Sequence, residues 1–148
     1  MTFKEKKSGS KSLVLIIILI SIVTSIGYLY FSPVFEQNKP KVHVAQKIFW
    51  NLKTSLKINL EDESGIKYYK VTFKDGNKDI VLNQKVFTDV QTQISIDVNP
   101  PKLDMFYKGE DGILEIEVVD NSKWNFLEGN KIIKTTQLKI DTRKPIAN

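Results

Sequence analysis

The sequence contains a single histidine, His43, and no cysteine, so disulfides, zinc ribbons and thiol nucleophiles are excluded. A histidine that acts as a general base or a metal ligand needs partners, such as a second histidine or a positioned nucleophile. In the segment "KVHVA", alternation places His43 opposite Val42 and Val44, on the solvent face of a first or edge strand. We therefore interpret His43 as a polar surface residue.

Three acidic segments could supply oxygen ligands to a cation such as Ca²⁺. They are "EDESG" at residues 61–65, "EDG" at residues 110–112 and "DNS" at residues 120–122. Their spacing matches no defined calcium-binding loop, and acidic residues beside Gly, Ser or Asn are common in turns. We predict that all three are solvated turns between strands. The sequence accordingly predicts no metal and no cofactor for this chain.

Aromatic residues cluster at Phe49-Trp50, at Phe106-Tyr107 and around Trp124. In "KIFWNL", Trp50 shares a face with Ile48 and Leu52, which predicts a place in the core. Exposed aromatic rings beside polar loops can stack on sugars or seat a partner protein. The candidates for such a contact are Trp124, Phe126, Phe106 and Tyr107. Gly-rich phosphate loops and the GxSxG nucleophile motif are absent from the sequence.

The longest apolar stretch is residues 13–30, "LVLIIILISIVTSIGYLY", which contains no charge and no proline. As a helix it would span roughly 27 Å, close to the hydrocarbon thickness of a bilayer. We predict a transmembrane helix over residues 13–31 whose membrane-embedded positions include Leu13, Ile17, Ile20, Val23 and Tyr30. Residues 1–12 carry four Lys and one Glu, so the positive-inside rule keeps this basic tail in the cytoplasm and sends the rest outward.

A cleaved signal peptide also begins with a basic region and an apolar stretch. The apolar run here is longer than that of a usual signal peptide, and "GYLYFSPVF" after it offers no small-residue cleavage site. An uncleaved anchor is therefore the preferred interpretation. The tail supplies a net charge of +3 out of the total of +5, and the exported part is close to balanced. This balance predicts no nucleic-acid partner.

After a polar linker, residues 32–40, apolar and polar residues alternate along the chain. The apolar sets are Leu56/Ile58/Leu60, Tyr69/Val71/Phe73, Ile94/Ile96/Val98, Leu114/Ile116/Val118 and Ile132/Leu138/Ile140. This period of two is typical of strands with one buried face, and "DGN" after the second set is typical of a hairpin turn. About seven short strands predict an all-β fold, an Ig-like two-sheet sandwich over residues 41–141.

The segments "KIFWNLK", "DESGIKYYKV" and "DNSKWNF" resemble the N-terminal, membrane-anchored region of bacterial cell-wall peptidases of the M23 (LytM or lysostaphin-like) family. The resemblance implies one transmembrane helix in the bacterial inner membrane, an Ig-like domain in the periplasm, and a later zinc endopeptidase domain that cuts peptidoglycan. The family's zinc site needs an H-x-x-x-D pair and an H-x-H pair, which one histidine cannot supply. The resemblance therefore implies a non-catalytic front end, with residues 142–148 as the start of a linker to a following domain.

Two functional classes remain open from the sequence. In the first, the chain is the anchor and spacer of a cell-wall hydrolase, which it positions or regulates. In the second, it is an independent single-pass adaptor whose sandwich binds a periplasmic protein or a glycan. Both classes place the chain at the inner membrane, and peptidoglycan or a cell-wall protein is the expected partner.

Overall fold

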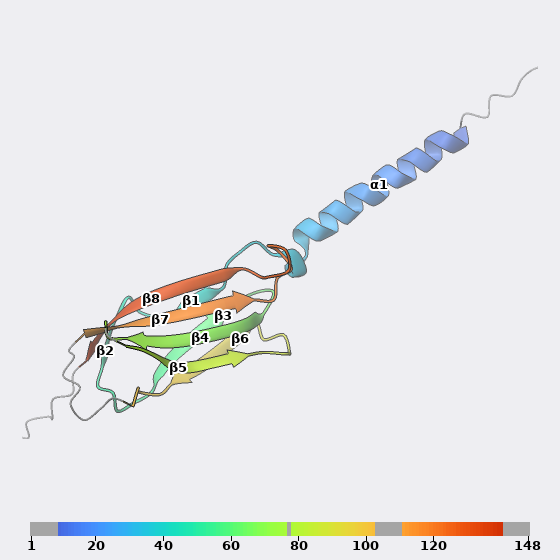
Figure 1. Ribbon diagram of the computed structural model, residues 1–148. Coiled ribbons are helices and arrows are strands. Elements are labelled where there is room, and N and C mark those ends of the chain that lie inside the picture. The colour runs from blue at the N-terminus through green and yellow to red at the C-terminus, as the bar shows by residue number, and fades with distance from the viewer. Residues whose placement is uncertain (1–8, 77, 103–110, 141–148) are drawn as a thin grey trace, which may run out of the picture.

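The computed structural model describes residues 9–76, 78–102 and 111–140. Helix α1 (Gly9–Phe31) leads through a short 3₁₀ helix, η1 (Pro33–Phe35), into strands that form a β-domain. The strands are β1 (Lys41–His43), β2 (Lys47–Trp50), β3 (Leu56–Glu61), β4 (Ile66–Lys74), β5 (Asp79–Val86), β6 (Gln93–Val98), β7 (Asp111–Asp120) and β8 (Lys131–Ile140). Helix α1 projects from one end of this domain as a single rod (Figure 1).

Within the described residues, α1 is the helix that is long and apolar enough to cross a membrane, over Lys11–Phe31. Its 23 residues make a rod of about 35 Å. The side chains predicted to lie in the membrane are all exposed: Leu13, Ile17, Ile20, Val23 and Tyr30. Because a helix that is apolar on every side needs apolar surroundings, α1 fits a membrane anchor or a signal sequence.

The strands form two sheets. One has the order β1-β3-β6, and the other has the order β2-β8-β7-β4-β5. In the second sheet β8, β7, β4 and β5 pair antiparallel, with β4 and β5 joined as the hairpin that the sequence predicts. A three-stranded sheet and a five-stranded sheet that share one core are the arrangement of an Ig-like sandwich. The predicted fold class is therefore confirmed, with eight described strands.

The first edge strand of the sandwich is divided between the sheets. Strand β1 pairs antiparallel with β3, whereas β2 pairs parallel with β8 and belongs to the opposite sheet. Gln46, just before β2, accepts a hydrogen bond from Gln137 N at 3.1 Å and so guides the chain onto β8. The alternation of Ile48 and Trp50 in the sequence agrees with a strand here, but its four residues gave no indication that β2 would join the opposite sheet from β1.

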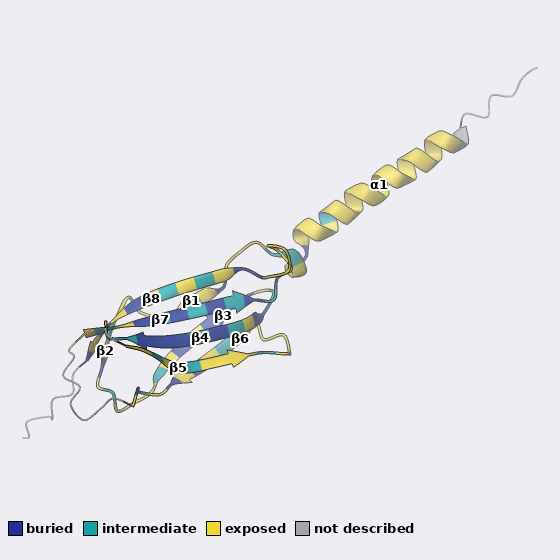
Figure 2. Ribbon diagram, viewed as in Figure 1, coloured by how far each residue is buried: buried dark blue, intermediate teal, exposed yellow. Residues whose placement is uncertain are grey.

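The core lies between the two sheets. Each predicted apolar set points its side chains inward, and Ile58, Val71, Phe73, Leu114, Ile116 and Val118 are fully buried. Figure 2 shows that β4 is mostly buried, whereas the edge strand β5 is largely exposed. Trp50 is 1% exposed and its Nε1 donates to the Thr54 carbonyl oxygen at 2.7 Å, which confirms its predicted place in the core.

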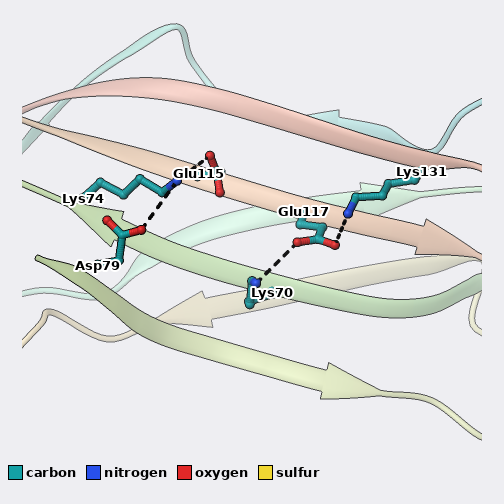
Figure 3. A network of polar contacts seen from close by, with 6 residues as sticks. All are labelled: Lys70, Lys74, Asp79, Glu115, Glu117 and Lys131. Carbon is teal, nitrogen blue, oxygen red and sulfur yellow. Dashed lines mark hydrogen bonds and ion pairs between the residues drawn. The ribbon is translucent and has the colours of Figure 1, made fainter. Parts of the chain in front are cut away.

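Alternating charges cross the outer face of the five-stranded sheet (Figure 3). Lys74 Nζ lies 2.9 Å from Glu115 Oε2 and 3.8 Å from Asp79 Oδ2. Glu117 lies between Lys70 and Lys131, and its hydrogen bond from Lys131 lowers the pKa of the carboxyl group. Such cross-strand pairs help to fix strand register, and because the two signs alternate they leave no single-sign patch.

Candidate functional site

The two described aromatic candidates lie at the end of the sandwich from which α1 projects. Trp124 and Phe126 belong to the loop between β7 and β8, residues 121–130, which lies beside η1 in Figure 1. Phe106 and Tyr107, the other two candidates, lie outside the described residues. The gathering of all four aromatic residues into one surface therefore stays a prediction.

The chain that leaves α1 is hydrogen-bonded to this end of the sandwich. The Val34 carbonyl oxygen accepts from Lys123 N at 2.6 Å. The Glu36 carbonyl oxygen accepts from Ser122 Oγ at 2.6 Å and from Asn130 Nδ2 at 2.9 Å. Residues 32–36, here called the junction segment, are thus held on the β7–β8 loop, although the sequence predicted them as part of a linker.

The junction segment also reaches the loop between β3 and β4. Glu36 Oε2 accepts from Ser64 N at 3.1 Å. That loop is joined in turn to the β7–β8 loop, because Asn121 N donates to the Gly65 carbonyl oxygen at 2.8 Å. Three segments that are far apart in the sequence therefore meet in one hydrogen-bonded unit at the base of α1.

Asp120 lies at the centre of this unit and is fully buried. Its Oδ1 accepts from Ser122 N at 3.0 Å and from Asn130 N at 2.7 Å, and its Oδ2 accepts from Asn130 Nδ2 at 2.9 Å. An aspartate that accepts the backbone N–H two residues ahead forms an Asx-turn, which starts the loop. The prediction that residues 120–122 form a solvated turn is wrong, because the junction segment covers this turn.

Gly129 permits the loop to close on Asp120. It has φ +86°, and a Cβ at this position would lie 2.5 Å from the Asp120 carbonyl oxygen and 2.9 Å from Oδ1. Both the backbone conformation and the close approach therefore require glycine. The sequence analysis did not single out Gly129 and Asn130, although a "GN" pair between two strands is a turn signal that could have indicated this closure.

Asp62, in the acidic segment 61–65, is buried as well, so the prediction of a solvated turn is wrong at this residue. Its Oδ1 accepts from Ser64 N at 2.9 Å and from Ser64 Oγ at 2.7 Å. Burial, together with the nearby charges of Asp120 and Glu36, raises the pKa of Asp62 to about 6, although the bonds from Ser64 oppose the shift. An acid with a pKa of about 6 therefore lies beside the junction segment.

The third acidic segment, residues 110–112, is only partly described. Asp111 begins β7 and its side chain is exposed and paired with Lys139, whereas Glu110 lies outside the described residues.

His43 is exposed on edge strand β1, as predicted, and its Nε2 lies 3.3 Å from Glu61 Oε2. Among the described residues, no group of three or more His, Asp and Glu side chains is arranged to hold a metal ion.

Comparison with known proteins adds little to this geometry. No protein-family model matches the chain, and no curated protein matches it. A solved structure of murine CRIg is similar over 72% of this chain and 100% of that chain, with 14% sequence identity and a TM-score of 0.41. A likeness at that level carries no functional argument.

The first prediction concerns Asn130, which joins Asp120 to the junction segment. The substitution Asn130→Ala removes the Nδ2 group that donates to Glu36 O and Asp120 Oδ2. Because these acceptors lie in a buried part of the structure, we expect the free energy of unfolding to fall by about 1–3 kcal/mol. Urea unfolding of the full chain in detergent micelles measures the change. Hydrogen exchange of residues 34–36 should become faster in the same variant.

The matched control is Asn38→Ala. Asn38 is exposed and its Nδ2 bonds only to the side chain of Glu36, at 3.1 Å, so its loss should change the free energy of unfolding by less than about 0.5 kcal/mol. If the two variants unfold at the same urea concentration, Asn130 does not hold the junction together.

The second prediction concerns pH. An acid whose pKa is higher in the folded state than in the unfolded state stabilises the protein below the unfolded value, and this contribution is lost as pH rises through about 6. Asp62→Asn keeps the Oδ1 acceptor and removes the charge. We expect Asp62→Asn to be more stable than the wild type near pH 7.5, by at most about 3 kcal/mol, and the gain to shrink toward pH 4.

Urea unfolding of both proteins in micelles across this pH range gives the difference directly. Carboxyl groups that do not interact with Asp62 affect both proteins alike and cancel in the difference. A variant that is less stable than the wild type at pH 7.5 would show that the Asp62 charge does not oppose folding.

Proposed function

We propose that this chain is a non-catalytic module anchored in the bacterial inner membrane by α1, with its N-terminus in the cytoplasm and its sandwich in the periplasm. In this proposal it positions or regulates a cell-wall hydrolase, as the resemblance to the M23 peptidases implies. The observation that supports it best is the junction, because the sandwich is fastened to the end of an exposed apolar helix by hydrogen bonds. An anchor helix whose following residues are hydrogen-bonded to the sandwich suits a module that sets the position of a partner enzyme.

The direction of the strands also supports a positioning role. Strand β8 begins at Lys131, next to the junction, and ends at Ile140 at the opposite end of the sandwich (Figure 1). Ten residues of strand cover about 33 Å. Ile140 therefore lies about 30 Å from Lys131, at the end of the sandwich away from α1, and in this proposal that end is turned toward the cell wall.

The alternative function is an independent adaptor that binds a periplasmic protein or a glycan. The exposed side chains of Trp124 and Phe126 favour it. The two functions differ in where the partner is held: the adaptor uses the junction end of the sandwich, whereas the hydrolase module presents its partner from the far end.

The third prediction tests the anchor and its orientation. Because the chain has no cysteine, single substitutions Lys6→Cys and Lys78→Cys can each be labelled uniquely. In bacterial spheroplasts, an impermeant maleimide should label Lys78→Cys directly and Lys6→Cys only after lysis. The full-length chain should also resist alkaline carbonate extraction. A shortened chain that is extracted would identify a cleaved signal sequence, and the opposite labelling would reverse the topology.

The fourth prediction tests the link to a hydrolase. An antibody against residues 41–140 should detect, in native membranes, a protein clearly larger than the 17.0 kDa of this chain, with chelator-sensitive activity on peptidoglycan in a gel overlay. A native band near 17 kDa would favour the adaptor instead.

A further inference from the structure

The loop between β7 and β8 exposes an apolar tip, which we define as Trp124, Phe126 and Leu127. Phe126 is 96% exposed, Leu127 67% and Trp124 45%. Core-forming side chains at such exposure are unfavourable in water, and Phe126 has almost no contact with the rest of the protein. Clustered exposed apolar groups of this kind mark a surface that meets a partner or a membrane.

The backbone of the tip is strained. Asn125, Phe126 and Leu127 have φ values of 56°, 56° and 72°, in the left-handed region that is unfavourable for residues with a side chain. The turn is closed by hydrogen bonds from Leu127 N to Lys123 O at 3.3 Å and from Glu128 N to Asn125 O at 3.2 Å. Asp120 and Asn130 hold its base. Strain held by surrounding structure in this way is typical of functional segments.

The tip lies next to the point where the chain leaves α1. Lys123 N donates to Val34 O at 2.6 Å, and Val34 is three residues beyond Phe31, the last residue of α1. Three residues reach at most about 10 Å. At the same end of α1 the aromatic side chains of Tyr28, Tyr30 and Phe31 are exposed, as expected for a helix end at the membrane interface.

We propose that the apolar tip inserts into the interface of the bilayer that α1 crosses, beside the outer end of the helix. This inference rests on the proposed membrane anchor. The tip's surroundings favour apolar insertion rather than attraction to anionic lipid, because Lys123 and Glu128 carry opposite charges on the same turn. Since α1 already tethers the sandwich to the bilayer, even weak insertion is favoured by the high effective concentration of lipid.

Two tryptophans make the proposal directly testable. Trp124 belongs to the tip, whereas Trp50 is buried and pairs in register with Ile140, at the end of the sandwich far from α1. The full chain is reconstituted into phosphatidylcholine liposomes whose acyl chains carry bromine, a short-range quencher of tryptophan emission. We expect the wild type to lose emission relative to unbrominated liposomes and Trp124→Phe, which keeps only Trp50, to lose none.

A matched pair of serine substitutions tests the role of the tip. Phe126→Ser should reduce the quenching of Trp124. Phe49→Ser removes a phenylalanine that is also exposed, at 75%, on β2 at the far end, and should leave the quenching unchanged. Because both side chains are largely exposed, both variants should keep the circular dichroism and the unfolding midpoint of the wild type.

The outcomes separate the inference from the anchor on which it rests. A chain that floats with the liposomes and resists carbonate, but whose Trp124 is not quenched, overturns the inference and leaves the anchor intact, with the tip free for a protein or a glycan. Equal quenching in Phe126→Ser and wild type also overturns it. A chain that does not float with the liposomes overturns the anchor and the inference together.

Discussion

The buried side chain of Asp120 makes the hydrogen bonds on which the end of the sandwich next to α1 depends. Its two oxygens accept three hydrogen bonds from the β7–β8 loop, and the loop shaped in this way presents Ser122 and Asn130 to the carbonyl oxygen of Glu36. A carboxylate removed from water is costly unless its lone pairs are satisfied, and here neighbouring N–H groups satisfy them. The side chain of Asp120 thus shapes the loop, positions the two groups that bind the junction segment, and holds the base of the apolar tip.

The hydrogen bonds to the junction segment restrict the angle between α1 and the sandwich. If residues 32–36 made no hydrogen bonds to the sandwich, the angle between α1 and the sandwich could change freely, because a flexible segment is easily reoriented. The bonds from Lys123, Ser122, Asn130 and Ser64 to residues 34–36 restrain that motion. Asp62, whose pKa burial raises to about 6, accepts from the same Ser64 N that donates to Glu36, so a titratable acid lies beside this restraint.

The sequence predicts the sandwich well and the junction poorly, and the reason is the range of the interactions. Ile58, Val71 and Ile116 reveal their burial through a period of two that is visible within a few residues. The burial of Asp62 and Asp120 depends instead on Glu36, whose carbonyl oxygen meets Ser122 and Asn130 across 86 and 94 positions of sequence. No local pattern carries that information, so both acids read as turn residues. The exposure of Trp124 could be predicted from its loop, but the left-handed turn that exposes Phe126 could not.

The division of the first edge strand has a mechanical consequence. Strand β2 runs parallel to β8; β2 follows α1 and β1 in the chain, and β8 ends at Ile140. A pulling force between α1 and the far end of β8 would act along both strands in opposite senses, so their hydrogen bonds would be sheared together rather than opened one after another. Under such a force this geometry makes forced unfolding slow, because several bonds must break in a single step.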